Sequence, residues 1–302
     1  MCIEKIEITS EEFMKKKKIF KKIFSIRRFD DKVIKTNWKL VRKIGNFAYQ
    51  FKSKENDIEF KFDMIDDVNV LVASPKEKND KAILYIHGGG FVSGGIKGSK
   101  SFCSMLASYT NSVVYACEYS LAPEKPFPYG FNDCVNVYKK LVNLYSSVTL
   151  IGDSAGGNLV LAVALKAKED KIKMPNLVVA HSPVVDLSMT IKRGNDEKDF
   201  IVKNSCFPQL KEIYCGDSDP KRYEISPYFG DYNNYSKLYI TCDEDETMFN
   251  DAKLLYDKAI AASVDAKLVI FKNGFHACAT IGTKSPETNK VLEEIANILK
   301  DI

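Results

Sequence analysis

The 302-residue sequence has only three histidines and lacks long apolar runs. No window of 18 residues is apolar throughout, which argues against a transmembrane helix. The first residues, MCIEKIEITSEEF, contain neither an apolar core nor a small-residue cleavage site, so we expect no secretory signal. None of the eight cysteines forms a CxxC pair, and no cysteine pair has a spacing suited to zinc. These absences predict a cytoplasmic protein with free, mostly buried thiols and with no metal or cofactor.

Positive charge is concentrated near the N-terminus. Residues 15–43 carry 13 Lys or Arg against Asp30 and Asp31, a local net charge of +11 in a chain whose total is +4. Such a block can bind anionic lipid or nucleic acid. The alternative, which we favour, is a solvated helix whose apolar stripe packs on the protein, and the residues at helical spacing are Phe13, Ile19, Phe20, Ile23 and Phe24. We therefore expect no nucleic-acid partner and no stable membrane insertion, and we leave peripheral membrane contact open.

Strand-like and helix-like patterns alternate along most of the chain. The composition, 45% hydrophobic and 28% charged, is that of a globular protein long enough for one large core. Apolar runs predict strands at 58–62, 68–73, 82–87, 112–119, 147–151, 176–181, 237–242 and 266–271. Helical periodicity predicts helices at 99–109, 131–145, 158–167, 248–262 and 287–299. The alternation predicts an α/β fold whose mostly parallel sheet has helices on both faces, with a functional insertion at about 187–236.

One serine stands in a pattern suited to nucleophilic chemistry. Gly152-Asp153-Ser154-Ala155-Gly156 matches G-x-S-x-G between an expected strand and an expected helix, which is the context that the motif requires. Glycines allow the tight turn and the close approach of strand and helix. The alternative is a serine that only caps the helix N-terminus.

A serine nucleophile needs a base and an orienting acid. His276 is the candidate base, because in this fold type the order along the chain is Ser, acid, His. We expect His181 to be a structural histidine and His87 to order the glycine run that follows it. The acid should lie on the loop after the strand at 237–242, where spacing alone leaves four candidates open: Asp243, Glu244, Asp245 and Glu246.

A glycine run, HGGGF at 87–91, follows an expected strand. Glycines let backbone N–H groups approach a developing oxyanion closely, which is a large contribution to acyl transfer. A phosphate-binding loop is the alternative, but the run is not G-x-G-x-x-G and no P-loop lysine follows it. Together with Ser154, the run favours an oxyanion hole.

Five motifs in this order resemble those of the hormone-sensitive-lipase-like esterase family of the α/β-hydrolase superfamily. The resemblance covers about 68–300, and the motifs read HGGGF (87–91), YSLAPEKPFPYGFNDC (119–134), GDSAGG (152–157), HSPVVDLS (181–188) and ISPYFGD (225–231). The resemblance implies an α/β-hydrolase fold with a helical cap. Residues 1–67 would form a basic, helical, cap-forming segment, and 68–302 would form the catalytic domain, with a cap insertion at about 187–236.

The resemblance also implies roles for single residues. Ser154 would be the nucleophile and His276 the base, with Glu246 as the acid and Asp243 as its alternative. The oxyanion donors would be the N–H groups of Gly89, Gly90 and Ala155. This chain departs from the family pattern in three places. Family members usually have glycine where this chain has Asp243 and an acid where it has Asn250, and the loop before their catalytic histidine is one residue longer.

The implied function is hydrolysis of short-chain acyl esters of small molecules through an acyl-enzyme, without a cofactor. Alternatives on the same fold are an amidase or peptidase, a lactone hydrolase, and a non-catalytic ligand receptor. Receptors that resemble this family lack the catalytic histidine, whereas His276 is present here. Family members often form dimers, so a homodimer is left open.

Overall fold

A single nine-stranded sheet organises the computed structural model, which describes residues 2–26, 42, 57–280 and 285–301. The strand order across the sheet is β1-β9-β8-β7-β6-β4-β5-β3-β2. All pairs are parallel except β2 with β3 and β3 with β5. The strands are β1 Cys2–Glu7, β2 Ile58–Ile65, β3 Val68–Pro75, β4 Lys81–Ile86, β5 Val113–Cys117, β6 Ser147–Asp153, β7 Leu177–His181, β8 Lys237–Asp243 and β9 Ala266–Lys272.

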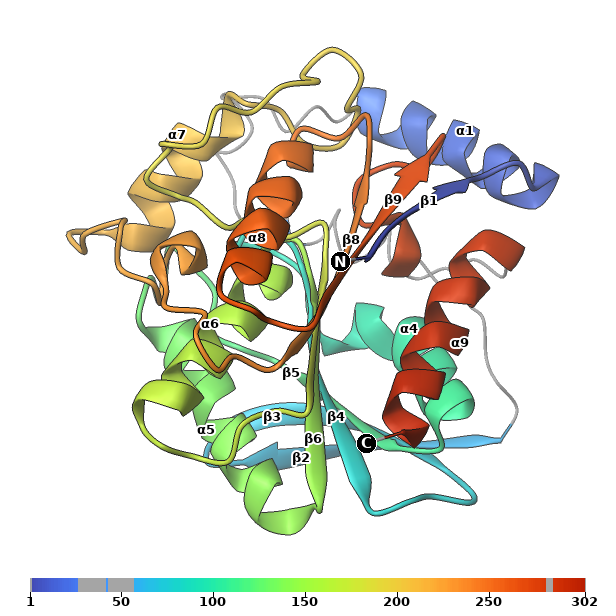
Figure 1. Cartoon of the computed structure of the whole chain (residues 1–302), viewed down its shortest axis with the longest axis vertical. Helices are drawn as coiled ribbons and strands as arrows, with labels where there is room; N and C mark the ends of the chain where they lie inside the picture. Colours follow the sequence, from blue (N-terminus) through green and yellow to red (C-terminus); the bar gives the residue numbers. More distant parts are fainter. Residues whose placement is uncertain (1, 27–41, 43–56, 281–284, 302) are drawn as a thin grey trace.

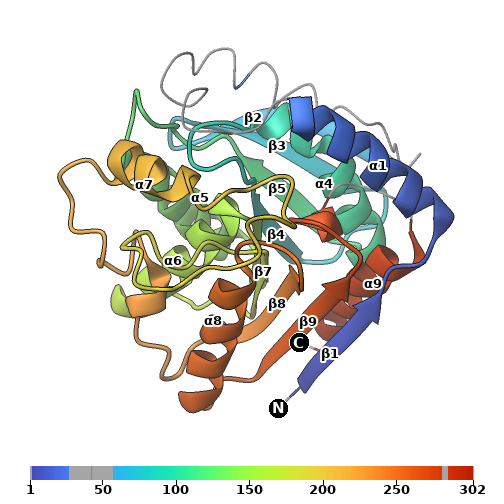
Figure 2. The same cartoon turned by 90° about the horizontal axis from the view of Figure 1, so that it is seen from above.

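Helices cover both faces of the sheet (Figures 1 and 2). One face carries α4 (Ile96–Thr110) and α9 (Pro286–Lys300), and the other carries α5 (Tyr129–Leu144), α6 (Ala155–Glu169) and α8 (Phe249–Ala261). Helices α1 (Glu11–Ile26) and α7 (Cys206–Leu210) lie beyond the carboxyl ends of the strands, in the upper part of Figure 1. A π-helical turn, Lys211–Cys215, continues α7, and two 3-10 turns are Pro227–Phe229 and Cys278–Thr280.

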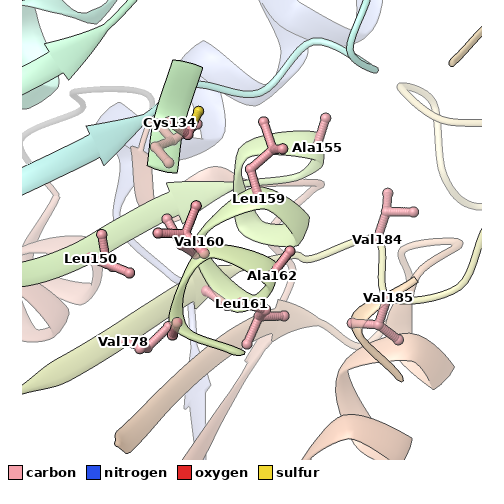
Figure 3. Packing of buried hydrophobic residues seen from close by; sticks show 14 of the residues in the cluster. Cys134, Leu150, Ala155, Leu159, Val160, Leu161, Ala162, Val178, Val184 and Val185 are labelled. Carbon is pink, nitrogen blue, oxygen red and sulfur yellow. The ribbon is translucent and has the colours of Figure 1, made fainter. Parts of the chain in front are cut away.

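Two apolar clusters separate on the two faces of the sheet. Along β4, Ile83 and Tyr85 belong to one cluster, whereas Leu84 and Ile86 belong to the other, as the two-residue period of a strand requires. Helix α6 is apolar nearly all round because it is enclosed on both sides. Figure 3 shows it between Leu150 and Val178 of the sheet and Val184 and Val185 of the loop after β7.

The predicted fold class and the predicted helices and strands after residue 57 are confirmed to within a few residues. Strand β1 was not predicted, and it forms because its backbone pairs in parallel with β9. The predicted boundary at 67/68 falls in the turn between β2 and β3, so two strands of the N-terminal segment lie in the main sheet. The division into 1–67 and 68–302 stays a prediction.

The predicted apolar stripe of the basic segment is partly correct. Phe13 is fully buried and its ring packs on Phe275, but Ile19 is wrongly included, because it is 52% exposed on the outer face of α1. Most of 27–43 lies outside the described residues.

All eight cysteines are described and free, and seven of them are buried. Within the described ranges, no helix is both long and apolar enough to cross a membrane.

Candidate active site

Ser154 occupies a strained turn between β6 and α6. Its φ of +54° and ψ of −116° are rare for a residue with a side chain, and such strain is concentrated at functional sites. A Cβ on Gly152 would lie 2.4 Å from the carbonyl oxygen of Gly156, and a Cβ on Gly156 would lie 2.0 Å from that of Ile86. Only glycine therefore permits this approach of α6 to β4 and β6, which confirms the tight turn expected from the motif.

The glycine run follows β4, the strand beside β6 in the sheet. Gly89 and Gly90 have φ values of +121° and +61°, which glycine adopts readily. The Gly88 amide donates to the carboxylate of Asp153 at 3.1 Å, which ties the run to the serine turn. In the part of the chain that the structure describes, the amides of Gly89, Gly90 and Ala155 donate to no acceptor.

His276 and Glu246 come together from the loops after β9 and β8. His276 Nδ1 lies 3.0 Å from Glu246 Oε2, and both side chains are buried. Burial alone would lower the pKa of His276, but the neighbouring acids, led by Glu246 through its hydrogen bond and its charge, outweigh burial and raise this pKa above its usual value. The charges of Asp199 and Asp153 act in the same direction. The surroundings therefore stabilise a positively charged imidazolium.

The loop after β7 connects these two halves of the site. The carbonyl of His181 accepts from the Ser154 amide at 2.8 Å. The hydroxyl of the next residue, Ser182, accepts from the Ala277 amide at 3.0 Å. Burial raises the pKa of the Glu246 carboxyl, and the Ser182 hydroxyl lies close enough to oppose this rise. The Ser154 turn and the loop of His276 are thus hydrogen-bonded to two adjacent residues, His181 and Ser182.

Two of the other acids in the loop after β8 have other partners. Asp243 accepts from the amides of Gly274 at 2.7 Å and Asp245 at 3.1 Å. Asp245 pairs with Lys198 at an exposed position. Among the acids left open by spacing, Glu246 is the one hydrogen-bonded to His276.

The two remaining histidines are buried away from this pair. His181 lies 2.8 Å from the hydroxyl of Thr241, and burial lowers the pKa of His181 to about 3, as expected for a structural histidine. His87 contacts the carbonyl of Gly88 at 2.8 Å and stacks on Tyr119. Its position agrees with an ordering role in the glycine run.

The sequence did not reveal three polar contacts that support the site. Asp199, in the insertion, accepts from the Thr247 amide next to Glu246 at 2.9 Å. The guanidinium of Arg193 pairs with Asp251 of α8 in a buried contact of 2.7 Å. Arg42 donates to the carbonyl of Val92 at 2.8 Å, just after the glycine run. These are ordinary charged residues in sequence, and only their contacts in the folded chain distinguish them.

Residues of the segment 187–236 pack on the glycine run. The Phe91 ring stacks on Tyr214 with centroids 3.8 Å apart, and a Cβ on Gly90 would lie 3.2 Å from Leu210 of α7. No group of three or more His, Cys, Asp or Glu in the described residues is arranged to hold a metal ion. The arrangement offers a serine, a histidine–carboxylate pair and unpaired backbone N–H groups, which suits acyl transfer.

Comparison with known proteins gives a consistent result. The family model of the α/β-hydrolase fold matches residues 83–280. An esterase of Acinetobacter venetianus is 28% identical over 220 residues, covering 71% of this chain and 73% of the relative. An acetyl-hydrolase of Streptomyces hygroscopicus is 26% identical over 231 residues, covering 75% and 77%. The crystal structure of a hormone-sensitive lipase from a metagenome library is 26% identical, with a TM-score of 0.86, covering 94% of this chain and 97% of that one.

Proposed function

The chain belongs to the hormone-sensitive-lipase-like esterases of the α/β-hydrolase superfamily and is a carboxylic ester hydrolase, and on this premise we propose that it cleaves short-chain acyl esters with Ser154 as nucleophile. The hydrogen bond of 3.0 Å between His276 and Glu246 is the observation that carries this proposal. It lies in loops joined through residues 181 and 182 to the strained turn of Ser154.

The mechanism follows from these groups. His276 takes the proton of Ser154 while the serine oxygen attacks the ester carbonyl, and Glu246 orients and stabilises the imidazolium. The amides of Gly89, Gly90 and Ala155 donate to the oxyanion of the tetrahedral intermediate. His276 returns the proton to the leaving alcohol, and an acyl-enzyme remains on Ser154. Water then attacks with His276 again as base, and the carboxylic acid leaves.

Short acyl groups, from acetyl to hexanoyl, fit the contacts beside the glycine run. Leu210 and Tyr214 of the insertion pack directly on Gly90 and Phe91, which limits the space there. A relative is named an acetyl-hydrolase, which supports the same choice. The N-terminal segment and the insertion 187–236 would together form the cap over the site. A cytoplasmic location and a homodimer stay predictions.

The test is hydrolysis of p-nitrophenyl esters by Ser154→Ala, with Ser108→Ala, at an exposed serine of α4, as control. We expect Ser154→Ala to lower kcat by at least about a thousandfold, because the triad acts as a unit. The control should retain normal turnover. Retention of a tenth of the activity by Ser154→Ala would exclude this serine as nucleophile, and faster cleavage of a matched anilide than of the ester would favour an amidase.

A further inference from the structure

The loop that carries His276 is held at successive residues by different elements. We call residues 273–277 the histidine loop. The Ala277 amide donates to Ser182, and His276 bonds to Glu246, as described above. The three preceding residues are held by groups that the proposed mechanism does not use. Two of these groups are charged: Lys17, on the N-terminal helix α1, and Asp243, at the end of β8.

Helix α1 contacts the histidine loop with both polar and apolar groups. Lys17 Nζ donates to the carbonyl of Asn273 at 2.9 Å. The rings of Phe13 and Phe20 lie 5.4 and 5.6 Å from that of Phe275, between centroids, and Phe275 is 4% exposed. The residue before His276 is thus enclosed by the N-terminal helix. A shift of α1 would be transmitted to the adjoining histidine.

Asp243 holds the residue between these two contacts. Its Oδ2 accepts from the Gly274 amide at 2.7 Å, and a Cβ on Gly274 would lie 2.6 Å from the same oxygen. The carboxylate therefore fills the space that the missing side chain leaves. An acid is unusual here, because the family resemblance implies glycine at the position of Asp243.

We propose that Lys17 and Asp243 are positioning residues that clamp the histidine loop at Asn273 and Gly274 and so hold His276 in register with Ser154. This inference rests on the proposed function, because His276 is taken as the base. The physical reason is that a catalytic base displaced by a fraction of an ångström loses much of its effect. Residues 273 and 274 are the points at which the loop leaves β9, so fixing them limits the freedom of the imidazole.

The clamp should respond to pH through Asp243. Burial, aided by the charge of Glu246, raises the pKa of Asp243 to about 7, and Lys17 opposes this rise. An ionised carboxylate accepts the Gly274 amide more strongly than a protonated one. Activity should therefore decline as the pH falls through this value. The charged and titratable groups that face Asp243 are Glu246 and Cys242 on its own strand and loop, Lys17 on α1, Lys198 in the insertion and Cys278 after the histidine loop.

The experiment compares Lys17→Met and Asp243→Asn with matched neutralisations of neighbouring charges. The controls are Lys18→Met, at the next and exposed position of α1, and Glu244→Gln, at the next position of the acid loop. Hydrolysis of p-nitrophenyl butyrate is followed from pH 5 to 9, and thermal unfolding is recorded for every variant. We expect each clamp variant to lower kcat at pH 8 by about tenfold with KM nearly unchanged, and the double variant to lose less than the product of the two losses.

The acid side of the pH profile separates positioning from a merely structural role. Lys17→Met should move the decline of kcat/KM to higher pH, because a positive charge beside Asp243 is lost, and Asp243→Asn should move it to lower pH. Clamp variants within twofold of their controls would overturn the inference. A loss that only follows the folded fraction, with the profile unmoved, would overturn it equally. A wild type that does not hydrolyse p-nitrophenyl butyrate would overturn both the inference and the proposed function. An active wild type with unaffected variants would overturn only the inference about Lys17 and Asp243.

Discussion

At the scale of single residues, Glu246 determines how strongly His276 holds a proton. Burial would lower the pKa of His276, but Glu246 raises it, and in the proposed mechanism His276 must be neutral to accept the Ser154 proton. In wild type, protonation of His276 should therefore add to the decline of kcat/KM at acid pH that protonation of Asp243 is expected to cause. Removing the charge of Glu246 lowers the pKa of His276, so the decline should move to lower pH.

We therefore expect Glu246→Gln to lower kcat by about a thousandfold or more, through lost orientation of the imidazole, and to shift the acid side of the profile downward. The measurement is kcat/KM between pH 5 and 9, with Asp245→Asn as control, since Asp245 is paired with Lys198 at an exposed position. A larger loss in Asp243→Asn than in Glu246→Gln would transfer the role of the acid to Asp243.

The acid that pairs with His276 could not be chosen from the spacing of the sequence. Asp243, Glu244, Asp245 and Glu246 are adjacent, so spacing predicts the loop but not the side chain that reaches His276. Only the family resemblance favoured Glu246. Asp199 lies 47 positions before Glu246 in an irregular insertion, and no periodicity or motif marks an acid there. Its influence on the pKa of His276 exists only in the folded chain.

At the scale of elements, the close contact of α6 with β4 and β6 presents Ser154. Replacing Gly156 by alanine places a Cβ 2.0 Å from the Ile86 carbonyl oxygen, so the helix must move. We expect Gly156→Ala to lower the free energy of unfolding by roughly 3 kcal/mol and to abolish most turnover. Urea denaturation monitored by circular dichroism measures this change.

The matched control is Gly194→Ala, where a Cβ would meet nothing within 4 Å. It should change the free energy of unfolding by less than about 0.5 kcal/mol. Equal stability of the two variants would contradict the close contact between α6 and β4.

Elements with strong periodicity were predictable, and elements that depend on a distant partner were not. The helix at 131–145 and the apolar strands were predictable because the spacing of their own apolar residues shows which side chains are buried. Strand β1, CIEKIE, has one buried residue, Ile6, and is stabilised by its backbone pairing with β9. Such pairing joins positions more than 260 residues apart, which no local pattern encodes.

At the scale of the whole molecule, the parallel sheet explains why the site forms at one edge. Strands β4, β6, β8 and β9 run in the same direction, so the loops that follow them all lie at one edge of the sheet. The chain continues from β4 to β5 on one side and from β6 to β7 on the other, so the order of the strands reverses at this point. The alternation of strands and helices therefore predicts that Ser154, Glu246 and His276 lie at one edge. It does not predict that the N-terminal helix packs on the histidine loop, because α1 reaches it only through tertiary contacts.

The most direct test of the central claim is to locate the covalent adduct that an ester-like organophosphorus probe forms with the folded protein. The probe is added in stoichiometric amount, residual hydrolysis of p-nitrophenyl butyrate is followed, and the adduct is mapped by peptide mass spectrometry. The account predicts one adduct per chain, on Ser154, formed in parallel with the loss of turnover, and none in Ser154→Ala. Loss of turnover with the adduct on any other residue would contradict it.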